Sequence, residues 1–342
     1  MDLAVQRASV AGCGAIFQQA HLAVYRTFDA SMRIVALAEP DPEARHRAGE
    51  ELGLPPGAQY EDIESLLEQE RPDWLIIASP PGMHLRAIRA AVRHRSKILC
   101  EKPLCLDPAE ADWAAGEVVE SGVFFSMVHN YLYQPGWVRL LHERERKDAG
   151  DPATIWLHER AAMPWNYARS RWRTDPAIGG GPLWEQLYHF LYVAEALMKS
   201  PIADAVARTW NTTTDFATGD TCGLMLLHQN GRLSMAQCTW AEAGEEDAVV
   251  HIQTAKGLAS YRYWQSPATI EWTGERPETI ALPEADALSE SGHAACFHRA
   301  FKAAQMGAPP PHPIGEAARF VRLLGRAETR SRPLDGVVRE PP

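Results

Sequence analysis

The stretch SVAGCGAI, residues 9–16, decides how the first half of this chain folds. A short apolar run enters a Gly-x-Gly turn and then a helix-like segment, which is the opening of a dinucleotide-binding βαβ unit. Gly12 permits the tight turn, and Gly14 lets the backbone approach a pyrophosphate at the helix N-terminus. The third position of the six-residue fingerprint is Phe17 rather than Gly or Ala. The motif therefore predicts a dinucleotide site but needs support from the residues that follow.

Support comes from a second strand-like run, residues 33–38, which ends at Glu39. An acidic residue at the end of the second strand is suited to bind the ribose 2′-hydroxyl. Its charge would repel a 2′-phosphate, so the sequence favours NAD over NADP. The alternative is that Glu39 only precedes the helix expected over residues 41–53, where an acid is also favourable.

Strand-like and helix-like segments go on alternating up to residue 128. Short apolar runs predict strands over residues 73–78, 98–100 and 123–128. Helices are expected over residues 61–70, 84–95 and 107–121. This alternation is typical of a doubly wound parallel sheet of the Rossmann type.

Two of these strands end in polar turns that contain proline. Ser79 and Pro80 follow one strand, and Glu101, Lys102 and Pro103 follow the next. In open α/β sheets the ligand crevice lies outside the carboxyl ends of the strands. A charged pair at this edge therefore indicates a site, although the triplet by itself fits a solvated strand end equally well.

Beyond residue 129 the alternation stops and strand-like segments dominate. They cover residues 154–161, 203–211, 221–227, 232–239, 248–254 and 257–263, and Asn230-Gly231 is a hairpin signal. Helices are expected over residues 134–146, 291–306 and 314–329. The predicted fold is α/β: a Rossmann domain over residues 1–129, then an α+β domain with a large, mostly antiparallel sheet over residues 130–342. The last segment of the chain is an open case: packing back on the first domain is also compatible with the sequence.

The stretch GGGPLWEQLYH, residues 179–189, is the second informative segment. Pro182 suits the first position of a helix. Glu185 and His189 are four residues apart, so they are expected to share one helical face, where the carboxylate would raise the pKa of the imidazole. The alternative is an ordinary helix pair at a solvated surface.

Taken in order, these motifs resemble the Gfo/Idh/MocA oxidoreductases, which include glucose-fructose oxidoreductase and inositol dehydrogenase. The resemblance rests on residues 12–16 with His21, residues 79–81 with His84, residues 101–103, and the three glycines followed by an acid and His189. The family usually has Asp where this chain has Glu185. It implies NAD, with NADP possible, held by Gly12, Gly14, Ala15, Ile16, Glu39, Ser79, Pro80, His84, Glu101, Lys102 and Asn130.

The resemblance also implies hydride transfer between nicotinamide and a secondary alcohol or ketone of a sugar, cyclitol or related cyclic polyol. In the oxidation direction His189 would accept the hydroxyl proton, and Lys102 would stabilise the developing negative charge. Glu101 is expected to position the loop or the cofactor. Glu185 is counted with the catalytic residues and either orients His189 or contacts the substrate. The expected substrate contacts are Tyr131, Trp165, Arg169, Trp172, Glu185 and His189.

Three other interpretations stay open. The chain could be a glycosidase that oxidises its substrate transiently with bound NAD, an imine or ring-carbonyl reductase, or a non-enzymatic dinucleotide-binding regulator. Because Lys102 and His189 are both present, the sequence favours an enzyme over the regulator.

The composition of the chain limits the kinds of partner that it is expected to bind. The formal net charge of −10 argues against nucleic acid and anionic membranes, and no apolar segment reaches the length of a membrane span. The start lacks the pattern of a secretory signal. Six scattered cysteines form no zinc-like cluster, so no metal site and a reduced, cytoplasmic protein are expected. The resemblance implies a homodimer or homotetramer that pairs through the C-terminal sheet.

Overall fold

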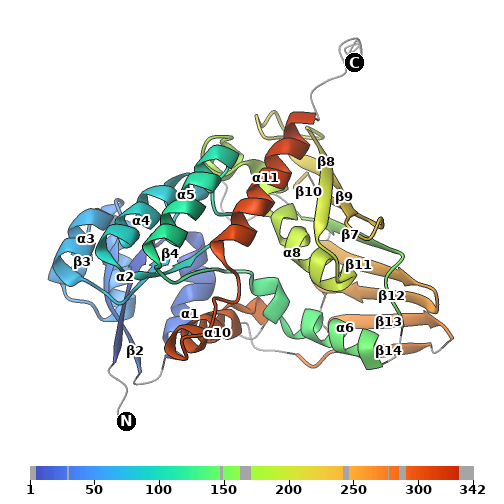
Figure 1. Ribbon diagram of the computed structural model, residues 1–342, viewed down its shortest axis with the longest axis horizontal. Helices are drawn as coiled ribbons and strands as arrows, with labels where there is room; N and C mark the ends of the chain where they lie inside the picture. Colours follow the sequence, from blue (N-terminus) through green and yellow to red (C-terminus); the bar gives the residue numbers. More distant parts are fainter. Residues whose placement is uncertain are drawn as a thin grey trace.

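The chain forms two β-sheets, each covered by helices, and helix α11 (Ile314–Arg330) lies between them (Figure 1). The computed structural model describes residues 5–28, 31–146, 149–161, 171–241, 246–265, 267–275, 277–284 and 290–330. Trp165 and Arg169, two of the expected substrate contacts, lie outside these residues. Within the described residues, no helix is long and apolar enough to cross a membrane.

The first sheet has six parallel strands in the order β3-β2-β1-β4-β5-β6, which confirms the predicted doubly wound sheet. The order reverses between β1 and β4, where open α/β sheets place their ligand crevice. The strands are β1 (Gln6–Ala11), β2 (Met32–Ala38), β3 (Gln59–Tyr60), β4 (Trp74–Ile77), β5 (Lys97–Cys100) and β6 (Phe125–Met127). Strand β3, only two residues long, was not predicted because so short a run carries no periodicity.

Helices around this sheet begin at capping residues. Asp107 accepts a hydrogen bond from the main-chain N of Glu110 at 2.9 Å, and Pro108 opens its helix. Helix α4 starts at Pro81 rather than at the predicted His84, because proline is favourable at the first helical position. The helices are α2 (Pro42–Leu52), α3 (Ile63–Glu70), α4 (Pro81–His94) and α5 (Pro108–Ser121).

The turn after β1 leads into a π-helical turn (Phe17–His21) and then into α1 (Leu22–Tyr25). Phe17, the departure from the glycine fingerprint, is fully buried, and its ring lies 6.0 Å from that of Tyr25. The large side chain therefore packs in the core beneath the first sheet.

The second sheet has eight strands in the order β14-β13-β12-β11-β7-β10-β9-β8. All neighbours are antiparallel except β7 and β10, which confirms the mostly antiparallel prediction. The strands are β7 (Thr154–Arg160), β8 (Ile202–Trp210), β9 (Thr221–His228), β10 (Leu233–Thr239), β11 (Asp247–Thr254), β12 (Gly257–Arg262), β13 (Thr269–Gly274) and β14 (Glu278–Ala281). Strands β13 and β14 were not predicted: β14 has only four residues, and β13 buries only Ile270 and Trp272.

Helix α8 (Leu187–Met198) covers one face of this sheet and buries ten residues (Figure 1). The other elements of this half are α6 (Pro135–Arg146), α7 (Gly181–Glu185), α10 (His293–Gln305) and two 3₁₀ turns (Asn130–Tyr133 and Arg171–Thr174).

The last two helices contact the first half of the chain. In α10, the ring of Phe301 lies 4.7 Å from that of Trp74, and the ring of Phe297 lies 4.9 Å from that of His21. Helix α11 runs between α5 and β8 (Figure 1), and its Arg322 pairs with Asp112. A division of the chain at residue 129 remains a proposal.

Candidate active site

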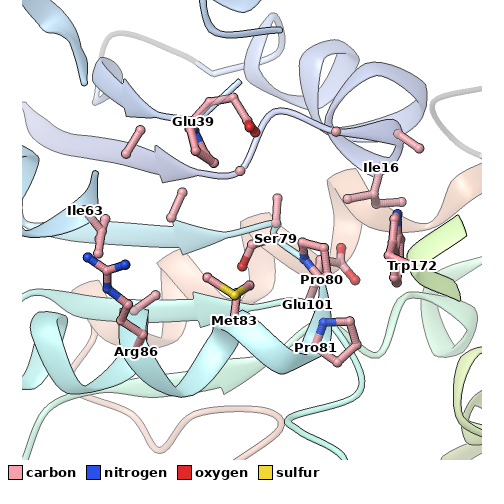
Figure 2. Close-up of a pocket in the computed structure, with 18 of the residues that line it drawn as sticks. Ile16, Glu39, Ile63, Ser79, Pro80, Pro81, Met83, Arg86, Glu101 and Trp172 are labelled. Carbon is pink, nitrogen blue, oxygen red and sulfur yellow. The ribbon is translucent and has the colours of Figure 1, made fainter. Parts of the chain in front are cut away.

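A pocket of about 400 Å³ lies along the carboxyl ends of the first sheet (Figure 2). Both halves of the chain contribute to its wall. The predicted site residues that line it are Gly12, Gly14, Ala15, Ile16, Glu39, Ser79, Pro80, Glu101, Lys102, Trp172 and Glu185. Figure 2 shows Ile63 and Arg86 on one side of the pocket and Trp172 on the other. Residues far apart in sequence therefore meet in the crevice that the strand order predicts.

The glycine turn fits a closely approaching dinucleotide. Gly12 has a φ of +96°, and a Cβ at this position would lie 2.6 Å from the main-chain N of Ser79. A Cβ on Gly14 would meet nothing within 4 Å, so this side of the turn is open to a ligand. The turn is thus packed against the loop after β4 and leaves room for a pyrophosphate at the start of the helix.

Glu39 lies at the end of β2, beside the glycine turn (Figure 2). Its Oε2 accepts a hydrogen bond from the main-chain N of Cys13 at 2.8 Å, and its Oε1 accepts one from the N of Asp41 at 3.1 Å. These bonds fix the carboxylate at the pocket wall, which is the position expected for a residue that binds a ribose.

His84 and Asn130, two of the expected cofactor-binding residues, are not among the residues that line the pocket. The His84 ring is fully buried between the carbonyl oxygens of Ser79 (2.7 Å) and Pro103 (2.9 Å). Asn130 donates its amide to the carbonyl of Ser291 at 2.8 Å. Both side chains connect loops to one another, because their polar atoms are engaged by the main chain. Their assignment as cofactor-binding residues therefore stays a prediction.

Lys102 connects the two halves of the site. Its Nζ donates a hydrogen bond to the main-chain O of Glu185 at 2.9 Å. Burial lowers the pKa of Lys102 to about 8, against the attraction of the Glu101 carboxylate. The ammonium therefore lies in a site where it can give up a proton close to neutral pH.

Glu101 holds three distant segments together. Its Oε1 lies 2.8 Å from Nε2 of His21 and 3.3 Å from Nε2 of His293. Burial acts to raise the pKa of Glu101, but the hydrogen bonds from His21 and His293 outweigh it and hold the pKa well below its usual value. The three side chains are close enough to hold a metal ion, yet they already bind one another. This geometry supports a positioning role for Glu101.

The expected pairing of Glu185 with His189 is wrong. The helix breaks at Gln186, so α7 ends at Glu185 and α8 begins at Leu187. The Glu185 carboxylate pairs with Arg173, while Nδ1 of His189 shares a hydrogen bond with the Tyr192 hydroxyl. Burial lowers the pKa of His189 well below its usual value, and Lys102 lowers it further. Spacing of four residues implies a shared face only in an unbroken helix.

A second cavity, of about 590 Å³, lies at the end of the second sheet where β7, β10 and β12 finish. Tyr131 and Gln186 line it, and the Tyr131 ring stacks on the His189 ring at 4.0 Å. Its other aromatic residues are Trp240, Tyr261, Tyr263 and Trp264. Trp172, expected at the substrate, lines the first pocket instead.

The site residues that were not predicted include Arg173, Gln186, Tyr192 and Glu159. Of these four, only Glu159 carried a usable signal. In β7 the residues Ile155, Leu157 and Glu159 alternate on the buried face, and a carboxylate at such a position requires a partner.

Fold and pocket define a dinucleotide-binding protein in which a second domain brings polar side chains to the cofactor. Residues 6–129 match the family described as an oxidoreductase family with an NAD-binding Rossmann fold, and residues 142–260 match the GFO/IDH/MocA C-terminal domain. The chain belongs to the Gfo/Idh/MocA oxidoreductases. The predicted family, fold class and type of cofactor are confirmed.

The relatives are distant. D-apiose dehydrogenase from Paraburkholderia graminis is 24% identical over 267 residues, which are 75% of this chain and 68% of that protein. Myo-inositol 2-dehydrogenase from Thermotoga maritima is 23% identical over 150 residues, 43% of this chain and 42% of that protein. An inositol dehydrogenase homolog from Azotobacter vinelandii, solved with NAD⁺, matches with a TM-score of 0.81 at 19% identity over 96% of this chain and 95% of that one. This last likeness shows the fold alone.

Proposed function

We propose that this chain is an NAD-dependent dehydrogenase that acts on a secondary alcohol, or on the corresponding ketone, of a sugar, cyclitol or related cyclic polyol. One observation supports it above the others. Lys102 lines the dinucleotide pocket at the edge of the first sheet, and its Nζ donates a hydrogen bond to Glu185 at the end of α7, the segment that leads to His189. Relatives that are named sugar and inositol dehydrogenases favour the same class of substrate.

When bound, the nicotinamide supplies the hydride acceptor or donor. His189 is neutral because burial lowers its pKa, and a neutral imidazole is the form that accepts a proton from the substrate hydroxyl. The Lys102 ammonium stabilises the negative charge that develops on the same oxygen. Since the pKa of Lys102 is about 8, this group can also pass on a proton.

The cavity of about 590 Å³ is proposed to hold the substrate ring. Tyr131 lines this cavity and stacks on His189, so a ring bound there would lie next to the proposed base. Aromatic walls suit the apolar faces of a cyclic polyol. Glu39 is proposed to favour NAD over NADP, because its fixed carboxylate would repel a 2′-phosphate.

The outer face of the second sheet is proposed to pair with a second copy of the chain. Seven large apolar side chains on neighbouring strands are between 37% and 45% exposed: Trp156, Val206, Trp210, Met225, Leu227, Leu233 and Met235. An apolar face of this extent is typical of an interface. A cytoplasmic location is proposed as well, since all six cysteines are buried free thiols.

The proposal is tested by offering the purified protein a panel of sugars, cyclitols and sugar acids with NAD or NADP and following nicotinamide absorbance. Substrate-dependent reduction of NAD is expected. Tight retention of NAD with turnover of a glycoside and no net reduction would instead support the glycosidase. Cofactor binding without turnover of any compound would contradict the dehydrogenase.

A further inference from the structure

Glu159 is a buried carboxylate to which the proposed reaction assigns no role. It lies on β7, is 1% exposed, and faces Cys238 on β10 and Ala248 on β11 across the sheet. The Tyr263 hydroxyl donates a hydrogen bond to Oε1. Within the described part of the chain, Oε2 is buried without a hydrogen-bond partner. Burying an ionised carboxylate is costly unless it is paired or hydrogen-bonded.

A line of contacts runs from Glu159 to the proposed base. The Tyr263 side chain, which bonds Oε1, meets the Tyr131 ring edge-on, with ring centroids 6.5 Å apart. The Tyr131 ring stacks on His189, with centroids 4.0 Å apart and planes inclined by 14°. Nε2 of Gln186 donates to the Tyr131 hydroxyl at 3.1 Å and so also holds this ring.

The ionisable and polar groups that face Glu159 come from several elements around it. Tyr263 follows β12, Tyr131 follows β6, Cys238 lies on β10, and Lys102 follows β5. Burial raises the pKa of Glu159 to about 7, while Tyr263, Gln186 and Lys102 act to lower it. The carboxylate therefore changes charge within the range in which an enzyme works.

We propose that Glu159 is a positioning residue of this site: its ionised carboxylate holds the Tyr263 hydroxyl, and through Tyr263 it keeps Tyr131 stacked on His189. A hydrogen bond to an ionised acceptor is roughly twice as strong as one to a neutral acceptor. Protonation of Glu159 therefore weakens its hold on Tyr263, and the packing of Tyr263 against Tyr131 loosens. Turnover consequently falls as the pH drops through the titration of Glu159. This inference rests on the proposed function, because His189 is its target.

The kinetic test compares the pH dependence of kcat in the parent and in Glu159→Gln. Misplacing the proposed base is expected to lower kcat roughly ten- to hundredfold, and the acid limb near neutral pH should vanish. Binding of NAD, measured by fluorescence, stays unchanged. Glu159→Asp should recover part of the activity, and Glu120→Gln, on the exposed face of α5, serves as the matched control. An unchanged profile in Glu159→Gln overturns the proposal.

A second measurement needs no substrate. In protein with isotope-labelled histidine, the His189 resonance is assigned as the one absent from His189→Gln. It is expected to shift with pH near neutrality in the parent and in Glu120→Gln, but not in Glu159→Gln. A His189 shift that persists in Glu159→Gln overturns the coupling. If the shift depends on Glu159 while no compound is turned over, the dehydrogenase fails and the positioning network stands.

Discussion

The Nζ of Lys102 lies 2.9 Å from the main-chain oxygen of Glu185, a residue 83 positions further along the chain. This bond joins the edge of the first sheet to the end of α7. It places the ammonium at the dinucleotide pocket, on the side to which the second domain contributes Trp172 and Arg173. The Glu185 side chain points to Arg173 and leaves its carbonyl to the lysine. The main-chain oxygen of Glu185, rather than its carboxylate, therefore orients Lys102.

Replacing Lys102 by alanine should lower kcat by roughly 10²-fold or more, because the charge that stabilises the substrate oxygen is lost. Cofactor affinity should remain near that of the parent. Lys97→Ala is a matched control, since Lys97 lies at the opposite end of β5 and bonds Gln6. Steady-state kinetics with NAD titration measures both. Normal turnover in Lys102→Ala would show that Lys102 is not in the active site.

His189→Gln should lower kcat by roughly 10²- to 10⁴-fold, the usual contribution of a general base. Exposed His142 on α6 provides the control substitution His142→Gln. Both variants are compared by stopped-time assays at saturating NAD. A negligible loss in His189→Gln would assign the proton acceptor to another group, with Lys102 the first to examine.

Glu39→Ala should narrow the preference for NAD over NADP by about tenfold, equivalent to about 1.4 kcal/mol. The reason is the loss of a carboxylate that is fixed by the main-chain N of Cys13 and of Asp41. Glu43→Ala, in the first turn of α2, removes a nearby acid without touching the pocket. The measured quantity is the ratio of kcat/KM for the two cofactors. An unchanged ratio would mean that Glu39 does not contact the ribose.

Asp220→Asn should destabilise the second sheet by about 1–3 kcal/mol, since a charged acceptor of several hydrogen bonds is lost. The Asp220 carboxylate accepts bonds from the main-chain N of Thr212, Thr213 and Thr214. Burial acts to raise its pKa, but these bonds prevail and lower the pKa to about 2. Because the pKa is lower in the folded state, the ionised carboxylate stabilises the fold at pH values above the unfolded pKa of 3.8. This contribution to stability is lost as the pH falls toward 2.

The free energy of unfolding in urea, measured from about pH 5 down to about pH 3, tests this assignment. The difference between parent and Asp220→Asn should shrink as the pH falls. A difference that stays constant over this range would mean that the charge on Asp220 contributes nothing to stability.

Met235→Lys, at the centre of the apolar outer face of β10, should break the proposed pairing of two copies. Burying an unpaired ammonium in an apolar interface is costly. Val119→Lys on α5, where the side chain is 72% exposed, adds the same charge away from that face. Light scattering gives the mass of each variant. A parent that is already monomeric, or a Met235→Lys variant that stays paired, would contradict this interface.

Sequence patterns predicted the first half of the fold well because its signals are local. Asp107 caps a helix, Gly12 takes a positive φ, and the apolar runs are short and lie between helices. The second half was less predictable. The spacing of Glu185 and His189 predicts a shared helical face, but the break at Gln186 separates the two residues, and no Gly or Pro within residues 183–189 predicts this break.

Local sequence patterns predict the parallel sheet, the glycine turn and the strand end that carries Glu101 and Lys102, since these depend on neighbouring residues and on backbone preferences. The partners of those groups follow from the tertiary fold instead. Lys102 meets the main chain of Glu185, and Glu101 meets His21 and His293. Such partners are separated by tens of residues, and packing brings them together. Their pKa values follow from that burial, which no local pattern encodes.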